Sequence, residues 1–323
     1  MADALFEFLN RHSSLIVTTH DPADADGLGA EKLLTLIGLS LGKQVRSINS
    51  GPVPDNFRFM DPGNTIENWG TASKTITRET AMIIVDTTDI NNIGELRGVV
   101  PLVSEVFVID HHDLNKACPF SGCIDSTASS TCEIVMESAM NAGIRLTPEY
   151  AMAAYAGIVY DTGFFAHAKT TRRTFKSAFA LTEAGVNPHE MYKTMNQNIS
   201  TGALLLEKVV MGTLEIKNKG RVAVQVLMKA DLESTGGTYE DAEEIVNIPL
   251  KSREVEVSIL AKQFTDGQTR CSLRSKGAVN VSKVAESLGG GGHITSAGFR
   301  SAKGIKETID MVLKKVSEAL DKK

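Results

Sequence analysis

The sequence predicts an α/β protein with two domains, and three observations carry this prediction. The chain has 323 residues, roughly the length of two domains. In its first half, short apolar runs rich in β-branched residues alternate with helical patterns, as they do around a parallel sheet. After residue 185, strand-like runs follow helical stretches and precede a final helix, which indicates a second, smaller α/β domain.

The first domain is expected to hold four strands and four helices. We expect strands over residues 15–19, 44–48, 81–85 and 106–109, and helices over residues 29–41, 129–142, 148–160 and 172–184. The last two strands are almost entirely apolar, so helices should cover both faces of this parallel sheet. Pro148 suits the first turn of its helix, and Gly143 and Gly185 suit the C-terminal caps of the helices before them.

The second half has a different order of elements. Helical stretches are expected over residues 188–212, then strands over 221–227, 255–262 and 269–275, a helix over 281–288, a glycine run and a last helix over 304–320. The domains expected are therefore residues 1–187, a helical linker of residues 188–212, and residues 213–323. Substrate is expected in a cleft between the two domains.

The composition excludes several classes of protein. Hydrophobic residues make up 42% of the chain and charged residues 23%, which is typical of globular and not of disordered or fibrous proteins. No apolar run reaches the roughly 18 residues of a membrane span, and the first ten residues lack the bases of a signal peptide. We therefore expect a cytoplasmic protein. The four cysteines lack C-x-x-C spacing, which favours reduced thiols over a zinc ribbon or a disulfide framework.

Acidic and histidine side chains gather where the predicted strands end. In an open parallel sheet, ligands bind in the crevice beyond the carboxyl ends of the strands, so these side chains are the candidates for chemistry. They are His20, Asp24 and Asp26 after the first strand, Asp86 after the third, Asp110, His111 and His112 after the fourth, and Asp161 at the end of a helix.

This set of side chains predicts a site for two divalent cations. Converging carboxylates repel one another strongly unless cations bind between them. Oxygen-rich ligands with one imidazole per ion favour Mn²⁺, with Mg²⁺ and Co²⁺ as alternatives. Two such ions about 3.5–4 Å apart serve in-line attack on phosphorus, so phosphoester hydrolysis is the expected reaction. For the first motif alone, the alternative is a polar loop in which an aspartate caps the following helix.

These motifs resemble those of a known family. Residues 20–26 read His-Asp-Pro-Ala-Asp-Ala-Asp, residues 85–89 Val-Asp-Thr-Thr-Asp, residues 110–112 Asp-His-His and residues 160–163 Tyr-Asp-Thr-Gly. In this order they resemble the four motifs of the DHH phosphoesterases. Residues 272–277 and the run from Gly289 to His293 are similar to the DHHA1 substrate domain that follows in that family. The chain looks closest to the subgroup of oligoribonucleases that also act as phosphoadenosine-phosphate phosphatases.

The resemblance implies a divided metal site. His20 and Asp24 would hold one ion, and Asp26, His111 and Asp161 would hold the other. Asp86 would bridge both ions.

Two further residues of the Asp-His-His motif have other expected roles. His112 would face the substrate phosphate as a charge stabiliser or acid, which makes it a catalytic candidate together with Asp86. The alternative for His112 is a histidine that only forms a hydrogen bond with a carboxylate. Asp110 is expected to support the site and not to bind an ion.

The glycine run of the second domain is a candidate phosphate site. It follows a helix and lacks G-x-G-x-x-G spacing, so it is not a dinucleotide-binding turn. Glycines without Cβ atoms let backbone N–H groups approach phosphate oxygens, and nearby cationic side chains add contacts. The alternative is a turn before the last strand. The expected substrate-binding residues are Arg274, Gly290, Gly291, Gly292 and His293.

The expected function is that of a dinuclear-metal phosphoesterase. It would hydrolyse short oligonucleotides to nucleoside monophosphates, dephosphorylate phosphoadenosine phosphate, or do both. Alternatives are a phosphodiesterase for linear or cyclic dinucleotides, a pyrophosphatase or exopolyphosphatase, and a catalytically silent nucleotide-binding regulator. The expected partners are short single-stranded oligonucleotides or nucleotides and not membranes or long duplexes, since no long basic groove is visible. A homodimer is left open.

Overall fold

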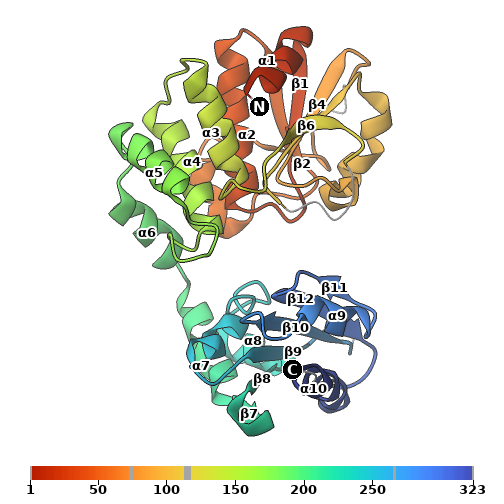
Figure 1. Ribbon diagram of the computed structural model, residues 1–323. Helices are drawn as coiled ribbons and strands as arrows, with labels where there is room; N and C mark the ends of the chain where they lie inside the picture. The colour runs from red at the N-terminus through yellow and green to blue at the C-terminus, as the bar shows by residue number, and fades with distance from the viewer. Residues whose placement is uncertain (1, 73–75, 113–117, 265–266, 322–323) are drawn as a thin grey trace. The chain divides into compact units, whose positions relative to one another are not determined.

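The protein divides into two compact units, residues 1–198 and 199–323, in the computed structural model described here (Figure 1). The structure describes residues 2–72, 76–112, 118–264 and 267–321. Each unit contains its own six-stranded sheet. The division between the units falls between α6, which ends at Asn196, and α7, which begins at Thr201.

The first unit is built on a parallel sheet. Its strands are β1 (Ser14–Thr18), β2 (Gln44–Asn49), β3 (Glu67–Asn68), β4 (Thr80–Val85), β5 (Val106–Asp110) and β6 (Ser121–Ile124). They lie in the order β3-β2-β1-β4-β5-β6, and every pair in the sheet is parallel. Because β1 pairs with both β2 and β4, the order of the strands reverses beside β1.

Helices connect these strands and continue the chain after them. The α-helices are α1 (Ala2–Arg11), α2 (Ala25–Ser40), α3 (Thr131–Asn141), α4 (Pro148–Asp161), α5 (Arg172–Glu183) and α6 (Pro188–Asn196). Among the described residues, the 3-10 helices between these strands are η1 (Asp55–Met60), η2 (Ile90–Gly98) and η3 (Val100–Leu102).

The two faces of this sheet are covered by helices of different kinds. Along β4, Ala81, Ile83 and Val85 pack into a core with α1 to α5, whereas Met82 and Ile84 pack on the other face with residues of η2. Figure 1 shows the α-helices grouped on one side of the sheet. The prediction of an apolar, doubly covered sheet is confirmed, and the second cover consists of 3-10 turns. Glycine and proline interrupt regular α-helix there, since Gly94 has φ of +57° and Pro101 follows closely.

Most predicted elements appear within a few residues of their expected positions. The largest difference in this unit is α2, which begins at Ala25 and not at residue 29, because the Asp24 side chain caps its first turn. Gly143 and Gly185 follow the ends of α3 and α5 with φ of +74° and +104°, as expected for helix C-caps. α1, β3 and β6 lie outside the predicted elements.

The second unit has a mixed sheet. Its elements are α7 (Thr201–Gly212), β7 (Glu215–Lys217), η4 (Asn218–Gly220), β8 (Val222–Leu227), α8 (Lys229–Thr235), η5 (Ile245–Lys251), β9 (Val257–Gln263), β10 (Thr269–Ser275), α9 (Val281–Glu286), β11 (Gly291–Gly292), β12 (Ser296–Ser301) and α10 (Ile305–Leu320). The strand order is β11-β12-β10-β9-β8-β7, in which β8 and β9 are parallel and the other pairs antiparallel. One face packs against α9 and α10, and part of the other packs against α7 and η5.

No helix among the described residues is both long and apolar enough to cross a membrane.

Candidate metal centre

The candidate side chains meet at the point where the strand order reverses. His20 lies two residues beyond β1, Asp86 directly follows β4, and His111 directly follows β5. These three strands are neighbours in the sheet, so their carboxyl ends form one edge. Asp26 lies in the first turn of α2, and Asp161 is the last residue of α4. Ligands of open α/β sheets bind at such a reversal point.

The first group of possible ligands consists of His20, Asp24 and Asp86. His20 Nε2 lies 3.4 Å from Asp24 Oδ2 and 3.4 Å from Asp86 Oδ2. One ligand atom from each of the three residues lies within 4.8 Å of the others, which is compact enough to surround one cation.

The second group consists of Asp26, His111 and Asp161. His111 Nε2 lies 2.8 Å from Asp161 Oδ2 and 3.9 Å from Asp26 Oδ2. It also lies 3.5 Å from Asp86 Oδ1. One oxygen of the Asp86 carboxylate therefore faces the first group and the other faces the second, the arrangement that a bridging ligand requires.

Asp24 caps α2, which was the alternative considered from the sequence, and its second oxygen still faces the first group. Its Oδ1 accepts hydrogen bonds from the backbone N–H groups of Asp26 at 2.9 Å and Gly27 at 3.1 Å, which caps α2. Its Oδ2 is directed at His20. Capping the helix therefore leaves one oxygen of Asp24 oriented toward the first group.

His112 is held by Asp110. Its Nδ1 lies 2.7 Å from Asp110 Oδ1, which also accepts a hydrogen bond from the His112 backbone N–H. This hydrogen bond raises the pKa of His112, although burial opposes the change. The same ring lies 3.7 Å from Asp86 Oδ1, and its side chain is 45% exposed. His112 thus has a carboxylate partner and a side open to solvent, while Asp110 is buried behind it.

The electrostatics of the cluster favour bound cations. Burial would lower the pKa of His20, but Asp24 and Asp86 outweigh it and raise that pKa to about 11. Burial and then the charge of Asp26 raise the pKa of Asp86 well above its ordinary value, and the same two causes raise that of Asp161. Like charges in a buried site produce such shifts when no cation offsets them.

A buried nitrogen in the second group is among the atoms that lack a hydrogen-bond partner. Within the part of the chain that the structure describes, His111 Nε2 is buried and forms no hydrogen bond of good geometry, although three carboxylates surround it. A neutral imidazole nitrogen in this position is a suitable metal ligand. The residues present therefore fit divalent cations.

Sequence reasoning missed the contribution of α3. The backbone N–H of Thr131 donates to Asp26 Oδ2 at 2.6 Å, and that of Cys132 donates to Asp26 Oδ1 at 2.9 Å. The Thr131 hydroxyl donates to Asp86 Oδ1 at 3.0 Å. The run Ser129-Ser130-Thr131 before a helix was the available signal, because such a helix start offers N–H groups to an anion.

Lys169 was also missed. Its Nζ donates to the backbone carbonyl of His111 at 2.8 Å and lies 3.5 Å from Nδ1 of the same residue. His167, from the same loop, lies with its Nδ1 2.9 Å from the Asp161 carbonyl oxygen. The loop after α4 is thus attached to two residues of the second group. Nothing in the spacing of these residues indicates that attachment.

The candidate residues of the second unit gather at one end of its sheet. Arg274 on β10 pairs with Ser296 on β12, and the His293 backbone N–H donates to the Ser296 carbonyl. Gly291 and Gly292 form β11 and pair with β12, so this part of the glycine run is a strand and not a turn. A Cβ on Gly292 would lie 2.5 Å from Ala297 Cα, and the residue has φ of +142°. Only glycine allows this close pairing.

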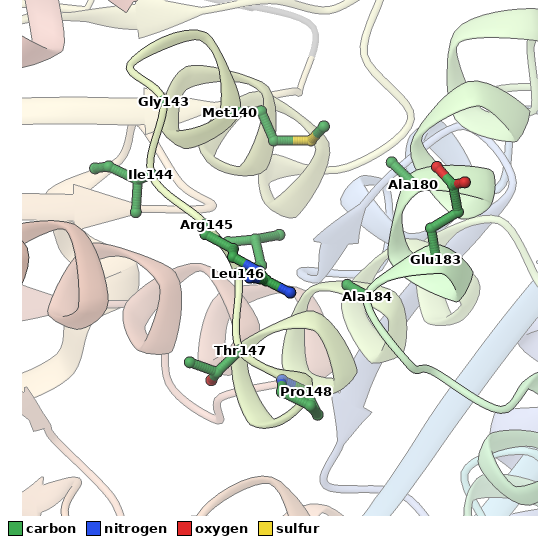
Figure 2. Close-up of a pocket in the computed structure, with 10 residues that line it drawn as sticks. All are labelled: Met140, Gly143, Ile144, Arg145, Leu146, Thr147, Pro148, Ala180, Glu183 and Ala184. Atoms are coloured by element: carbon green, nitrogen blue, oxygen red, sulfur yellow. The ribbon is translucent and has the colours of Figure 1, made fainter.

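A separate groove lies in the first unit, away from the candidate metal ligands. Figure 2 shows it between the end of α3, the start of α4 and the end of α5. Its volume is about 790 Å³. The candidate ligand Asp161 ends α4, and Thr131, which donates to Asp26 and Asp86, begins α3, so both lie at the ends of these two helices away from the groove. The groove shares no residue with either ligand group.

Comparison with known proteins decides the family. The model of the DHH family, N-terminal domain, matches residues 14–158, and that of the DHHA1 domain matches residues 219–322. A relative from Streptococcus mutans, named a probable bifunctional oligoribonuclease and PAP phosphatase NrnA, is 30% identical over 68% of this chain and 69% of its own. This chain belongs to the DHH/DHHA1 phosphoesterases. It is therefore a metal-dependent phosphoesterase, as its motifs predicted.

Other relatives differ in the activity that their names state. A Thermus thermophilus protein named a bifunctional oligoribonuclease and PAP phosphatase NrnA is 25% identical over 95% of this chain and 89% of its own. A Bacillus subtilis cyclic-di-AMP phosphodiesterase GdpP is 28% identical over 99% of this chain, which spans 49% of that protein. The fold matches an exopolyphosphatase-related protein from Bacteroides fragilis with a TM-score of 0.90 at 23% identity, covering 99% and 95% of the two chains.

Proposed function

We propose that this chain hydrolyses short oligonucleotides to nucleoside monophosphates, dephosphorylates phosphoadenosine phosphate, or does both, with two divalent cations. The observation that carries the proposal is the position of Asp86, whose two oxygens face two separate groups of ligands. Two ions held by one bridging carboxylate suit in-line displacement at phosphorus. Relatives named as oligoribonucleases and PAP phosphatases, similar over nearly the whole chain, support the substrate class.

The proposed ligand sets follow the geometry. His20 and Asp24 would hold one ion, and Asp26, His111 and Asp161 the other. Mn²⁺ is the proposed metal, because each set combines carboxylate oxygens with one imidazole. When bound, the ions supply positive charge for the phosphate oxygens and lower the pKa of water.

His112 is proposed to act on the leaving group. Asp110 holds the ring through Nδ1, so proton transfer to the leaving oxygen would use Nε2. The raised pKa of His112 keeps the ring protonated to a higher pH, which suits an acid or a charge stabiliser. Asp110 is proposed as the residue that orients this ring.

The second unit is proposed to bind the substrate. Arg274, His293 and the backbone of Gly290, Gly291 and Gly292 lie around one end of its sheet. Backbone N–H groups together with a guanidinium form a suitable site for a terminal phosphate.

A second candidate function is hydrolysis of linear or cyclic dinucleotides. The similarity to a cyclic-di-AMP phosphodiesterase, at 28% identity over 99% of this chain, favours it. Hydrolysis of pyrophosphate or polyphosphate is a further, less favoured alternative. The regulator alternative would predict a missing metal ligand, and each of the six proposed ligands is present in the sequence.

A product assay separates these functions. The full chain with Mn²⁺ is incubated with RNA of two to about twenty nucleotides, phosphoadenosine phosphate, cyclic dinucleotides and pyrophosphate, and products are resolved by chromatography. We expect the highest kcat/KM on the shortest RNAs or on phosphoadenosine phosphate. A preference for cyclic dinucleotides or pyrophosphate would replace the proposed substrate, and no hydrolysis of any of them would refute the enzymatic proposal.

A further inference from the structure

Three basic side chains form a row across the second sheet. Arg270 on β10 pairs directly with Arg300 on β12 and with Lys262 on β9, and both pairs are antiparallel. Directly paired residues of antiparallel strands point to the same face, with Cβ atoms roughly 5 Å apart. We call Lys262, Arg270 and Arg300 the cationic row.

The row lies on the face away from α9 and α10. Cys271 and Phe299, each next in sequence to a member of the row, belong to the core under those helices. Side chains alternate along a strand, so Arg270 and Arg300 point to the other face. Arg274 follows Arg270 by four residues and shares that face, about 14 Å away along β10.

The charge of the row is only partly balanced. Glu243 Oε1 lies 2.6 Å from the Nζ of the fully buried Lys262 and 3.9 Å from Arg270 Nη1. Arg270 is 44% exposed, and Arg300 is exposed without an ion pair to any other described residue. Like charges directly opposite each other destabilise a sheet. A bound anion would offset that cost, and guanidinium groups suit phosphate oxygens.

We propose that the exposed members of the cationic row, Arg270 and Arg300, bind a second phosphate of a single-stranded oligonucleotide, while the Arg274 end of the same face binds the first. Glu243, which pairs with the buried Lys262, also lies 3.9 Å from Arg270 Nη1, so one carboxylate faces both cations. The proposal rests on the proposed action on oligonucleotides and deepens it. A substrate with one terminal phosphate would contact only the Arg274 end of the face, and a longer chain would also contact Arg270 and Arg300.

The test measures binding without hydrolysis. The full chain, kept in a metal chelator, is titrated with fluorescent single-stranded RNAs of two and five nucleotides at several salt concentrations. Variants are Arg270→Ala, Arg300→Ala and the charge-conserving Arg270→Lys. The matched control is Lys315→Ala on α10, which removes one charge from a half-exposed residue on the opposite face of the same unit. Thermal unfolding verifies that each variant is folded.

We expect Arg270→Ala and Arg300→Ala each to weaken the pentanucleotide about tenfold, to reduce the slope of log K against log salt by about 0.7, and to affect the dinucleotide less. Arg270→Lys should keep the wild-type slope. If Arg270→Ala and Arg300→Ala bind the pentanucleotide as tightly as Lys315→Ala does, the proposed site is wrong. If inorganic triphosphate displaces the RNA as readily as unlabelled RNA does, the site does not bind an oligonucleotide as such. A lack of hydrolysis with Mn²⁺ counts against the proposed function alone, because binding is measured without metal.

Discussion

The hydroxyl of Thr131 donates a 3.0 Å hydrogen bond to Asp86 Oδ1, across 45 residues of sequence. The backbone N–H of the same residue donates to Asp26 Oδ2 at 2.6 Å. The first turn of α3 thus holds two of the carboxylates that are proposed to bind metal. Thr131 is fully buried, so water does not replace these contacts. We infer that Thr131 is a positioning residue that orients Asp86 between the two ligand groups.

Thr131→Val tests this role, because it replaces the hydroxyl with a methyl group of similar size. We expect the affinity for Mn²⁺ and kcat to fall about 10- to 100-fold, as for other residues that orient metal ligands. Isothermal titration with Mn²⁺ and steady-state kinetics measure both quantities. Thr131→Ser keeps the hydroxyl and should stay near wild type. If both variants bind Mn²⁺ as the wild type does, Thr131 is only a packing residue.

Gly157→Ala is predicted to disturb the metal centre through packing. A Cβ at this position of α4 would lie 2.5 Å from Cys132 Sγ and 2.9 Å from Asp26 Oδ1. Relieving this overlap should cost roughly 1–3 kcal/mol in the free energy of unfolding and shift Asp26. Denaturant unfolding and Mn²⁺ titration measure the two effects. Gly98→Ala, where a Cβ meets nothing within 4 Å, is the control and should change neither. A Gly157→Ala variant with wild-type stability would contradict the packing.

Glu31 gives a prediction for the dependence of stability on pH. Burial raises the pKa of this α2 carboxyl to about 8, against a hydrogen bond from Asn49 that lowers it. The folded state therefore binds the proton more tightly than the unfolded state, whose pKa is about 4.3. The protonated Glu31 therefore contributes its full stabilisation of the folded state below the unfolded pKa, and this stabilisation is lost as pH rises through about 8.

Glu31→Gln removes this ionisation and should be more stable than the wild type at pH 8, by up to roughly 4 kcal/mol, and closer to it at pH 5. Chemical denaturation at both pH values measures the difference. The exposed Glu95→Gln serves as the control and should show no such change with pH. A constant difference between wild type and Glu31→Gln across this range would show that Glu31 is ionised in the folded protein.

Asp86→Ala and Asp110→Ala separate a bridging carboxylate from a supporting one. Asp86 faces both ligand groups, whereas Asp110 contacts His112. We expect Asp86→Ala to abolish turnover and Asp110→Ala to retain part of it. Steady-state kinetics measure the loss, with circular dichroism to verify folding because removing a carboxylate also relieves repulsion. Equal, near-normal activity of both variants would exclude the bridging role.

The sequence allowed prediction of those parts of the site that follow from strand ends. Asp86 and His111 directly follow apolar strands and His20 lies two residues beyond one, and the ends of parallel strands meet at one edge. Thr131 was not predictable in the same way, because its bond to Asp86 depends on how α3 packs against the sheet. The contact of Lys169 with His111 likewise joins residues 58 positions apart.

The fold was predictable to a similar extent. The fully buried, apolar β4 and β5 were predicted nearly to the residue, since their composition admits few alternatives. β3 has two residues and β11 is formed by two glycines, so neither carries an alternating pattern. Their pairing is a result of tertiary contacts that local sequence does not contain.

The number of Mn²⁺ ions bound by the wild type, His20→Ala and His111→Ala tests the central claim most directly. Titration by calorimetry or by spin resonance of free Mn²⁺ should give two ions per chain for the wild type. It should give one for each variant, and His20→Ala and His111→Ala should each lose a different site. Binding should also weaken as pH falls, because protons compete with the metal for the imidazole nitrogens. A single ion in the wild type, or loss of the same ion in both variants, would contradict a centre divided by Asp86.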